Sequence, residues 1–160
     1  MPAENETTPR WVFRVEVQDR PGAMTSIASA FSNEGINLDT IAAHGAPSHV
    51  ETTGTVVVTF HATEDDQEKM ARKVKRLVKV LRLEMHPYTS TFVRKSALIV
   101  TSRPLDSNEI PVGITHEPLP TSQDQHAYFM TGAPSTLDAL MDRLEESNTI
   151  QDLVYTVLAM

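Results

Sequence analysis

The stretch VEVQDRPGAMTSIASAFSNEGINLDTI, residues 15–41, decides the fold. It opens with alternating apolar residues, breaks at Asp19-Arg20-Pro21-Gly22, continues with apolar residues at helical spacing, and becomes extended again after Gly35. Glycine is favoured where a chain turns tightly or where a helix ends in the left-handed conformation. The stretch therefore predicts a strand, a helix that ends at Gly35, and a second strand that returns beside the first.

The rest of the first half completes an α+β unit. Strands are expected at 11–17, 36–43, 55–60 and 80–85, and a second helix follows Thr63, a good N-cap residue. The expected buried helical positions are Met24, Ile27, Ala28 and Phe31 in the first helix and Met70, Val74, Leu77 and Val78 in the second. The order βαββαβ predicts a ferredoxin-like split unit, with two helices on one face of an antiparallel sheet.

The second half looks like a degenerate copy of the first. Strands are expected at 92–101, 127–131 and 150–158, with a helix that buries Leu137, Leu140, Met141 and Leu144 and ends near Asn148. Residues 102–125 contain four prolines and no helical stripe, so one helix of the repeat is missing. We therefore expect a loose lead at 1–10, a first domain at 11–88 and a second at 89–160.

Composition and charge exclude several kinds of function. The 160 residues are 40% hydrophobic, and 21 acidic against 14 basic residues give a net charge of −7. This charge disfavours nucleic acid, which needs a basic face. The chain has no cysteine, so disulfides, thiolate zinc sites and thiol nucleophiles are excluded. No apolar window suits a leader or a membrane span, and we expect a cytoplasmic protein.

No pattern of an active site or a metal site is found. The six histidines have no pair at i, i+4, and GxSxG, GxGxxG and P-loop motifs are missing. We therefore expect no catalytic residues, no metal and no cofactor. The basic run Arg72, Lys73, Lys75, Arg76, Lys79 and Arg82 places Arg72, Arg76 and Lys79 on one helix face, which predicts a solvated face or a docking surface for an acidic partner.

The turn before the first helix is the candidate binding site. Gly22 lets a ligand approach the backbone, and the N-terminus of a helix favours a carboxylate. On the returning strand, Asn37 offers an amide and Asp39 a carboxylate, which suit the polar groups of a free amino acid. A plain tight turn at Pro21-Gly22, with Asn37 bonded to the loop, fits the same spacing.

A family resemblance favours the binding site. The residues DRPGAMTSIASAFSNEGINLDTI, 19–41, resemble the signature of the ACT regulatory domain, a βαββαβ module that binds amino acids at interfaces between paired domains. The segments RLVKVLRLEMH, 76–86, and YFMTGAPSTLDALMDRLEESNTIQDLVYTVLAM, 128–160, resemble the small regulatory subunit of acetolactate synthase. Two departures stand out, because residues 44–54 form a longer loop than the family usually has and 102–125 replace a helix.

The resemblance implies a role in feedback regulation. It places the effector on the turn residues Asp19, Pro21, Gly22, Ala23 and Met24 and on Asn37. It implies valine, leucine or isoleucine as the effector and a thiamine diphosphate-dependent catalytic large subunit as partner. The open four-stranded sheet, whose edges and helix-free face need cover, predicts a homodimer or a larger assembly. The alternatives are a freestanding double-ACT sensor that acts on transcription or another enzyme, and a small isomerase or lyase with its own active site.

Overall fold

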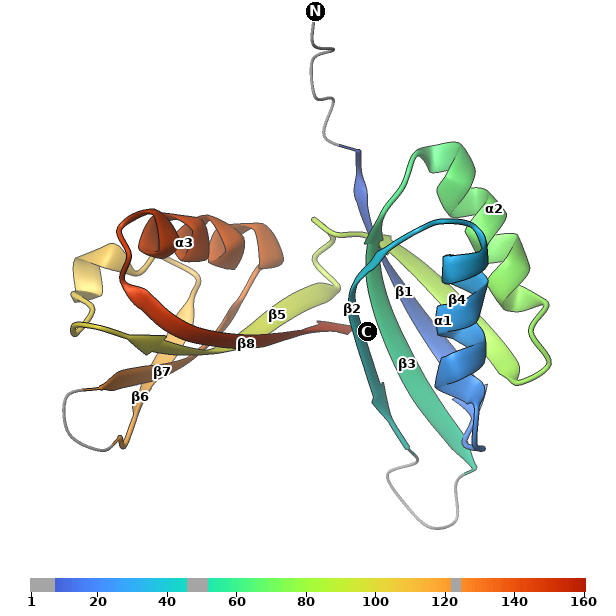
Figure 1. The fold of residues 1–160 in the computed structure, drawn as a ribbon, viewed down its shortest axis with the longest axis horizontal. Helices are drawn as coiled ribbons and strands as arrows, with labels where there is room; N and C mark the ends of the chain where they lie inside the picture. Colours follow the sequence, from blue (N-terminus) through green and yellow to red (C-terminus); the bar gives the residue numbers. More distant parts are fainter. Residues whose placement is uncertain (1–7, 46–51, 122–124) are drawn as a thin grey trace, which may run out of the picture. The chain divides into compact units, whose positions relative to one another are not determined.

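The computed structural model describes residues 8–45, 52–121 and 125–160. The chain forms two compact units, one up to Tyr88 and one from Thr89. Each unit has its own sheet and its own hydrophobic core (Figure 1). In the described part of the chain, no helix is long and apolar enough to cross a membrane.

The first unit has the predicted βαββαβ order. Its elements are β1 (Arg10–Gln18), α1 (Ala23–Asn33), β2 (Leu38–His44), β3 (Thr53–His61), α2 (Glu64–Lys75) and β4 (Val80–Pro87). The strands form an antiparallel sheet in the order β2-β3-β1-β4, and both helices cover one face of it (Figure 1). This is the ferredoxin-like split unit that the sequence predicts.

The core of the first unit lies between the sheet and the helices. Phe13, Phe31 and Phe60 are fully buried and meet edge to face, with ring centroids 4.8 to 6.0 Å apart. Two predicted core positions are wrong. Met24 is 47% exposed because it lies at the open end of α1, and Val78 is 93% exposed because α2 ends at Lys75.

The predicted helix boundaries have identifiable chemical causes. The Thr63 hydroxyl accepts a hydrogen bond from the backbone N–H of Asp66, which caps α2. Gly35 ends α1 with a φ of 70°, a conformation that costs glycine little. Asn148, after α3, has a φ of 53° and confirms the predicted end of that helix, since asparagine tolerates this conformation better than most residues.

In its described residues, the second unit repeats the sheet order of the first without one helix. Its elements are β5 (Val93–Thr101), the 3₁₀ turn η1 (Ser107–Glu109), β6 (Thr115–Leu119), β7 (His126–Gly132), α3 (Pro134–Glu146) and β8 (Ile150–Ala159). The strand order β6-β7-β5-β8 matches β2-β3-β1-β4 by position. The predicted face of α3 is buried, through Leu137, Leu140, Met141 and Leu144.

Strand β6 was not predicted from the sequence. It is short, and Pro118 removes a backbone donor from it. β6 is the edge strand of its sheet and pairs only with β7. Edge strands tolerate proline, because one side of the strand forms no ladder hydrogen bonds. Segment 102–125 therefore replaces a helix, as predicted, but also supplies the fourth strand.

Candidate functional site

The turn between β1 and α1 is built from residues 19–22. The backbone N–H of Asp19 donates to the carbonyl oxygen of Thr52, 2.7 Å away, so the end of β1 is held beside the start of β3. Gly22 is the N-cap of α1 and has a φ of 84°, which strains any residue with a side chain. Among the described residues no side chain caps this helix. The N–H of Ala23 donates to the carbonyl oxygen of Arg20, which leaves the N–H groups of Met24 and Thr25 available to a ligand.

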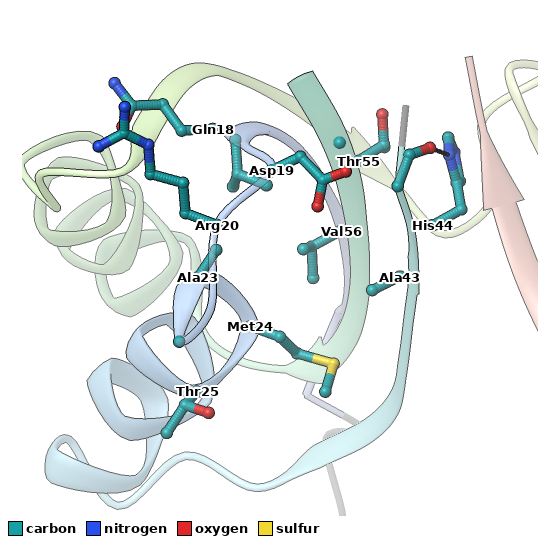
Figure 2. Close-up of a pocket in the computed structure, with 14 residues that line it drawn as sticks. Gln18, Asp19, Arg20, Ala23, Met24, Thr25, Ala43, His44, Thr55 and Val56 are labelled. Carbon is teal, nitrogen blue, oxygen red and sulfur yellow. Dashed lines mark hydrogen bonds between the residues drawn. The ribbon is translucent and has the colours of Figure 1, made fainter. Parts of the chain in front are cut away.

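A cavity of about 230 Å³ opens beside this turn. The turn and α1 form one wall, and the end of β2 and the start of β3 form the other (Figure 2). In Figure 2 the Asp19 carboxylate and the Met24 side chain project into the space between the walls, and Arg20 extends away from it. The volume suits a small metabolite, because drug-sized ligands usually occupy roughly 300–1,000 Å³.

The two walls carry different chemistry. Polar groups come from Asp19 and the start of α1, whereas Met24, Ala43 and Val56 are apolar. The cavity therefore presents a carboxylate, a helix N-terminus and an apolar surface to one ligand. A zwitterion with an aliphatic side chain matches these three features.

Glycines keep the second wall open. A Cβ on Gly45 would lie 2.9 Å from Oδ2 of Asp19, so a side chain there would collide with the carboxylate. A Cβ on Gly54 would lie 2.9 Å from the carbonyl oxygen of His44. Gly45 and Gly54 thus flank the connection between β2 and β3, most of which, 46–51, lies outside the described residues, together with much of the predicted long loop 44–54.

The structure brings only part of the predicted site together. Asp19, Gly22, Ala23 and Met24 line the cavity, and Pro21 is part of the turn. Residues at the ends of β2 and β3, such as Ala43 and Gly45, were not predicted. The sequence feature that marks them is a pair of glycines on either side of the loop that ends beside the turn. This feature can be recognised only when the pairing of β2 with β3 is known.

Asn37 and Asp39 are not near the cavity in the same chain. Leu38 lies opposite Phe60, and His44 lies opposite Thr55, so β2 runs parallel to β1 and only its last residues reach the turn. Asn37 is about 20 Å from that end. The prediction that one chain brings Asn37 beside Gly22 is therefore wrong. The predicted return of the second strand beside the first is also wrong, because β3 lies between β1 and β2 in the sheet.

Asp39 is already engaged by the first unit. Its Oδ2 accepts a hydrogen bond from Nε of Arg10 at 2.8 Å and lies 3.3 Å from Nε2 of His61. The Asn37 side chain is exposed and forms no hydrogen bond with any residue in the described ranges. Asn37 is therefore the better candidate of the two for binding a ligand.

The basic run does not form one helix face. Since α2 ends at Lys75, Arg76 is its C-cap and Lys79 lies in the following turn, which corrects the predicted face. Three of the basic residues pair with acidic ones: Arg72 with Glu68, Lys73 with Glu34, and Arg82 with Glu84. No group of three or more histidine, aspartate or glutamate side chains that could hold a metal occurs among the described residues.

Comparisons with known proteins agree with this architecture. Residues 13–82 match the family described as AHAS small subunit-like ACT domain. The acetolactate synthase small subunit of Mycolicibacterium smegmatis is 24% identical over 142 residues, which cover 86% of this chain and 82% of that protein. The corresponding protein of Mycobacterium leprae is 23% identical over 141 residues, with 86% and 82% covered.

A solved structure extends the likeness to both units. The acetolactate synthase small subunit from Thermotoga maritima superposes with a TM-score of 0.74 at 18% identity, and the match covers 94% of this chain and 96% of that one. At this identity the superposition shows a common fold. Residues 13–82 are thus similar to an ACT domain of the acetolactate synthase small-subunit kind, and the superposition shows that both units share the fold of that solved structure.

Proposed function

We propose that this protein is the regulatory subunit of an acetolactate synthase and that it senses a branched-chain amino acid. The observation that carries the proposal is the cavity between the turn 19–22 and the ends of β2 and β3, where Asp19, a helix N-terminus and Met24 face one space. The relatives named acetolactate synthase small subunit support the identity of the partner.

The amino acid binds by three separate contacts. Its α-carboxylate meets the N–H groups at the start of α1, where the helix dipole favours negative charge. Its α-ammonium meets the Asp19 carboxylate, and its side chain lies against Met24, Ala43 and Val56. Because the apolar wall is built from side chains of limited size, it selects the aliphatic ligands valine, leucine and isoleucine.

A second copy of the chain completes the site. Asn37 lies at the far end of its own β2, so it reaches a bound amino acid only from a neighbouring chain. The resemblance to ACT domains implies binding between paired domains, which agrees with this geometry. A homodimer in which each chain offers its turn to the other chain's Asn37 is therefore the smallest assembly that forms a full site.

The chain acts on its partner rather than on a substrate of its own. Effector binding at the turn changes how stably two first units pair with each other. This pairing is thermodynamically coupled to the state of the catalytic large subunit, so the effector changes the activity of that subunit. The effector can alter activity only as far as it binds the two states of the complex with different affinity.

Calorimetry and co-purification test the proposal. Valine, leucine and isoleucine are titrated into the purified chain, and at least one is expected to bind with saturation. A tagged copy is then expected to retain a thiamine diphosphate-dependent large subunit when the two are produced together. Binding without retention would favour a freestanding sensor, and the lack of both would contradict the proposal.

A further inference from the structure

Lys79 is hydrogen-bonded to both ends of the turn that borders the cavity. It follows α2 and immediately precedes β4. Its Nζ atom lies 2.6 Å from the carbonyl oxygen of Pro21. Its own carbonyl oxygen accepts a 2.8 Å hydrogen bond from the backbone N–H of Gln18. Lys79 thus holds the turn where it leaves β1 and again just before α1 begins.

Gly22 allows the ammonium group to come this close. A Cβ on Gly22 would lie 3.0 Å from Nζ of Lys79, which is tighter than nearly all contacts of real side chains. The left-handed conformation of Gly22 favours glycine, whereas the Lys79 ammonium, as the end of a flexible side chain, would only have to shift slightly for a Cβ placed there. Lys79 itself does not line the cavity, so its ammonium contacts the turn from outside the site.

The Pro21–Gly22 peptide connects the ammonium to the ligand. This peptide is trans, so its carbonyl and its N–H point in opposite directions. The carbonyl faces Lys79, and among the described residues the Gly22 N–H has no acceptor, although Gly22 lines the cavity. A cation bound to the carbonyl polarises the peptide, which makes its N–H a stronger donor.

We propose that Lys79 is a positioning residue for the effector carboxylate. Its ammonium fixes the Pro21–Gly22 peptide with the N–H directed at the cavity and adds positive charge behind the N-terminus of α1. This inference rests on the proposed function, since it concerns the same amino-acid site. It separates Lys79 from the other basic residues of the run, which the sequence alone treats as equivalent.

Calorimetric titration of the wild type and three variants tests the inference. Lys79→Met keeps the length of the side chain but removes its charge and donors, and it is expected to bind the amino acid roughly three- to tenfold more weakly. Lys79→Arg keeps a cationic donor and is expected to bind within about twofold of the wild type. Lys75→Met is the matched control, because it removes the same charge from an exposed residue at the end of α2.

Two further readouts separate positioning from simple structural support. Melting temperatures of Lys79→Met and the wild type are expected to agree. The ratio of their affinities is expected to shrink when the salt concentration rises from about 20 mM to about 500 mM, since salt screens a charge effect but not a packing effect.

Each outcome has a defined meaning. If the wild type binds and Lys79→Met binds equally well, the inference is overturned and the proposed function stands. If Lys79→Met and Lys79→Arg lose affinity and melting temperature together, Lys79 only supports the fold and the inference is again overturned. If the wild type binds none of the three amino acids, the proposed function fails and the inference fails with it.

Discussion

Gly22 and Asn37 lie at opposite ends of helix α1. Gly22 caps its first residue, Ala23, and Asn37 follows its last residue, Asn33, by one short turn. The helix has 11 residues, so the two positions are separated by more than about 16 Å. A single amino acid cannot span this distance. Two residues that the sequence places in one motif thus reach one ligand only if they come from different chains.

Asn37→Ala and Asp19→Asn are each expected to weaken amino-acid binding. Each change removes a hydrogen bond or ion pair to a charged group of the ligand, which corresponds to about 1.5–3 kcal/mol, or roughly tenfold or more in affinity. Both side chains are exposed, so both variants are expected to fold. Calorimetry measures the affinities, and Asp142→Asn, an exposed carboxylate of the second unit, is the charge-matched control.

Mixing the two variants shows whether one site is shared between chains. In a mixed dimer, the Asn37→Ala chain supplies an intact turn and the Asp19→Asn chain supplies an intact Asn37. After denaturation and refolding of an equal mixture, about a quarter of the sites are expected to recover wild-type affinity. No recovery would mean that the two residues act within one chain or in separate sites.

Gly45→Ala is expected to weaken amino-acid binding indirectly, through the Asp19 carboxylate rather than through a contact of the new methyl group with the ligand. Its Cβ would lie 2.9 Å from Oδ2 of Asp19, so the carboxylate must move. Thr52→Ala, at the other end of the same connection, is the control, because Thr52 contacts Asp19 through its backbone carbonyl. Wild-type affinity in Gly45→Ala, measured by the same titration, would show that the Asp19 carboxylate does not need its present position.

In the second unit, Asp138→Ala is expected to destabilise the fold more than Lys95→Met. Lys95 is 3% exposed, and its Nζ lies 2.5 Å from Oδ1 of Asp138 and 3.8 Å from the ring centroid of Tyr155. Removal of Asp138 leaves a buried cation without its anion, a loss of about 3 kcal/mol. Lys95→Met leaves a carboxylate that is 27% exposed and still partly hydrated, so it costs less. Urea unfolding measures both, and the reverse order would contradict this account.

Glu109 is expected to titrate far below an ordinary glutamate. Hydrogen bonds from Arg103 and from the backbone N–H of Asp106 lower its pKa from 4.5 to about 2. A lowered pKa means that the ionised carboxylate stabilises the fold above pH 4.5 and that this contribution disappears as the pH falls toward 2. NMR titration of the Glu109 carboxyl group checks this, with Glu109→Gln as the control. A midpoint near 4.5 would show that the ion pair does not form in solution.

The sequence predicts the fold correctly wherever the apolar residues of a segment follow a single spacing, that of a strand or that of a helix. The alternation around Phe13 and Val15 and the helical spacing of Ile27 and Phe31 are confirmed, because each pattern matches a single buried face. Strand β6 was missed because a proline on an edge strand looks like a loop.

The site was harder to predict from sequence than the fold. The turn at Gly22 carries its own signal, since a strand, a glycine and a helix follow each other in the chain. The opposite wall does not, because Ala43, Gly45 and Val56 meet Asp19 only through the pairing of β2 and β3. The position of Asn37 required the direction of β2 relative to β1, which periodicity alone does not specify.

The most direct test of the regulatory role is the activity of a purified acetolactate synthase large subunit. Acetolactate formation is measured for the large subunit alone, with this chain, and with this chain plus valine, leucine or isoleucine. We predict that the chain raises the activity, that at least one of the three amino acids lowers it again, and that Asn37→Ala keeps the activation but loses most of the inhibition. Activity that is the same with and without the chain, at every amino-acid concentration, would contradict the account.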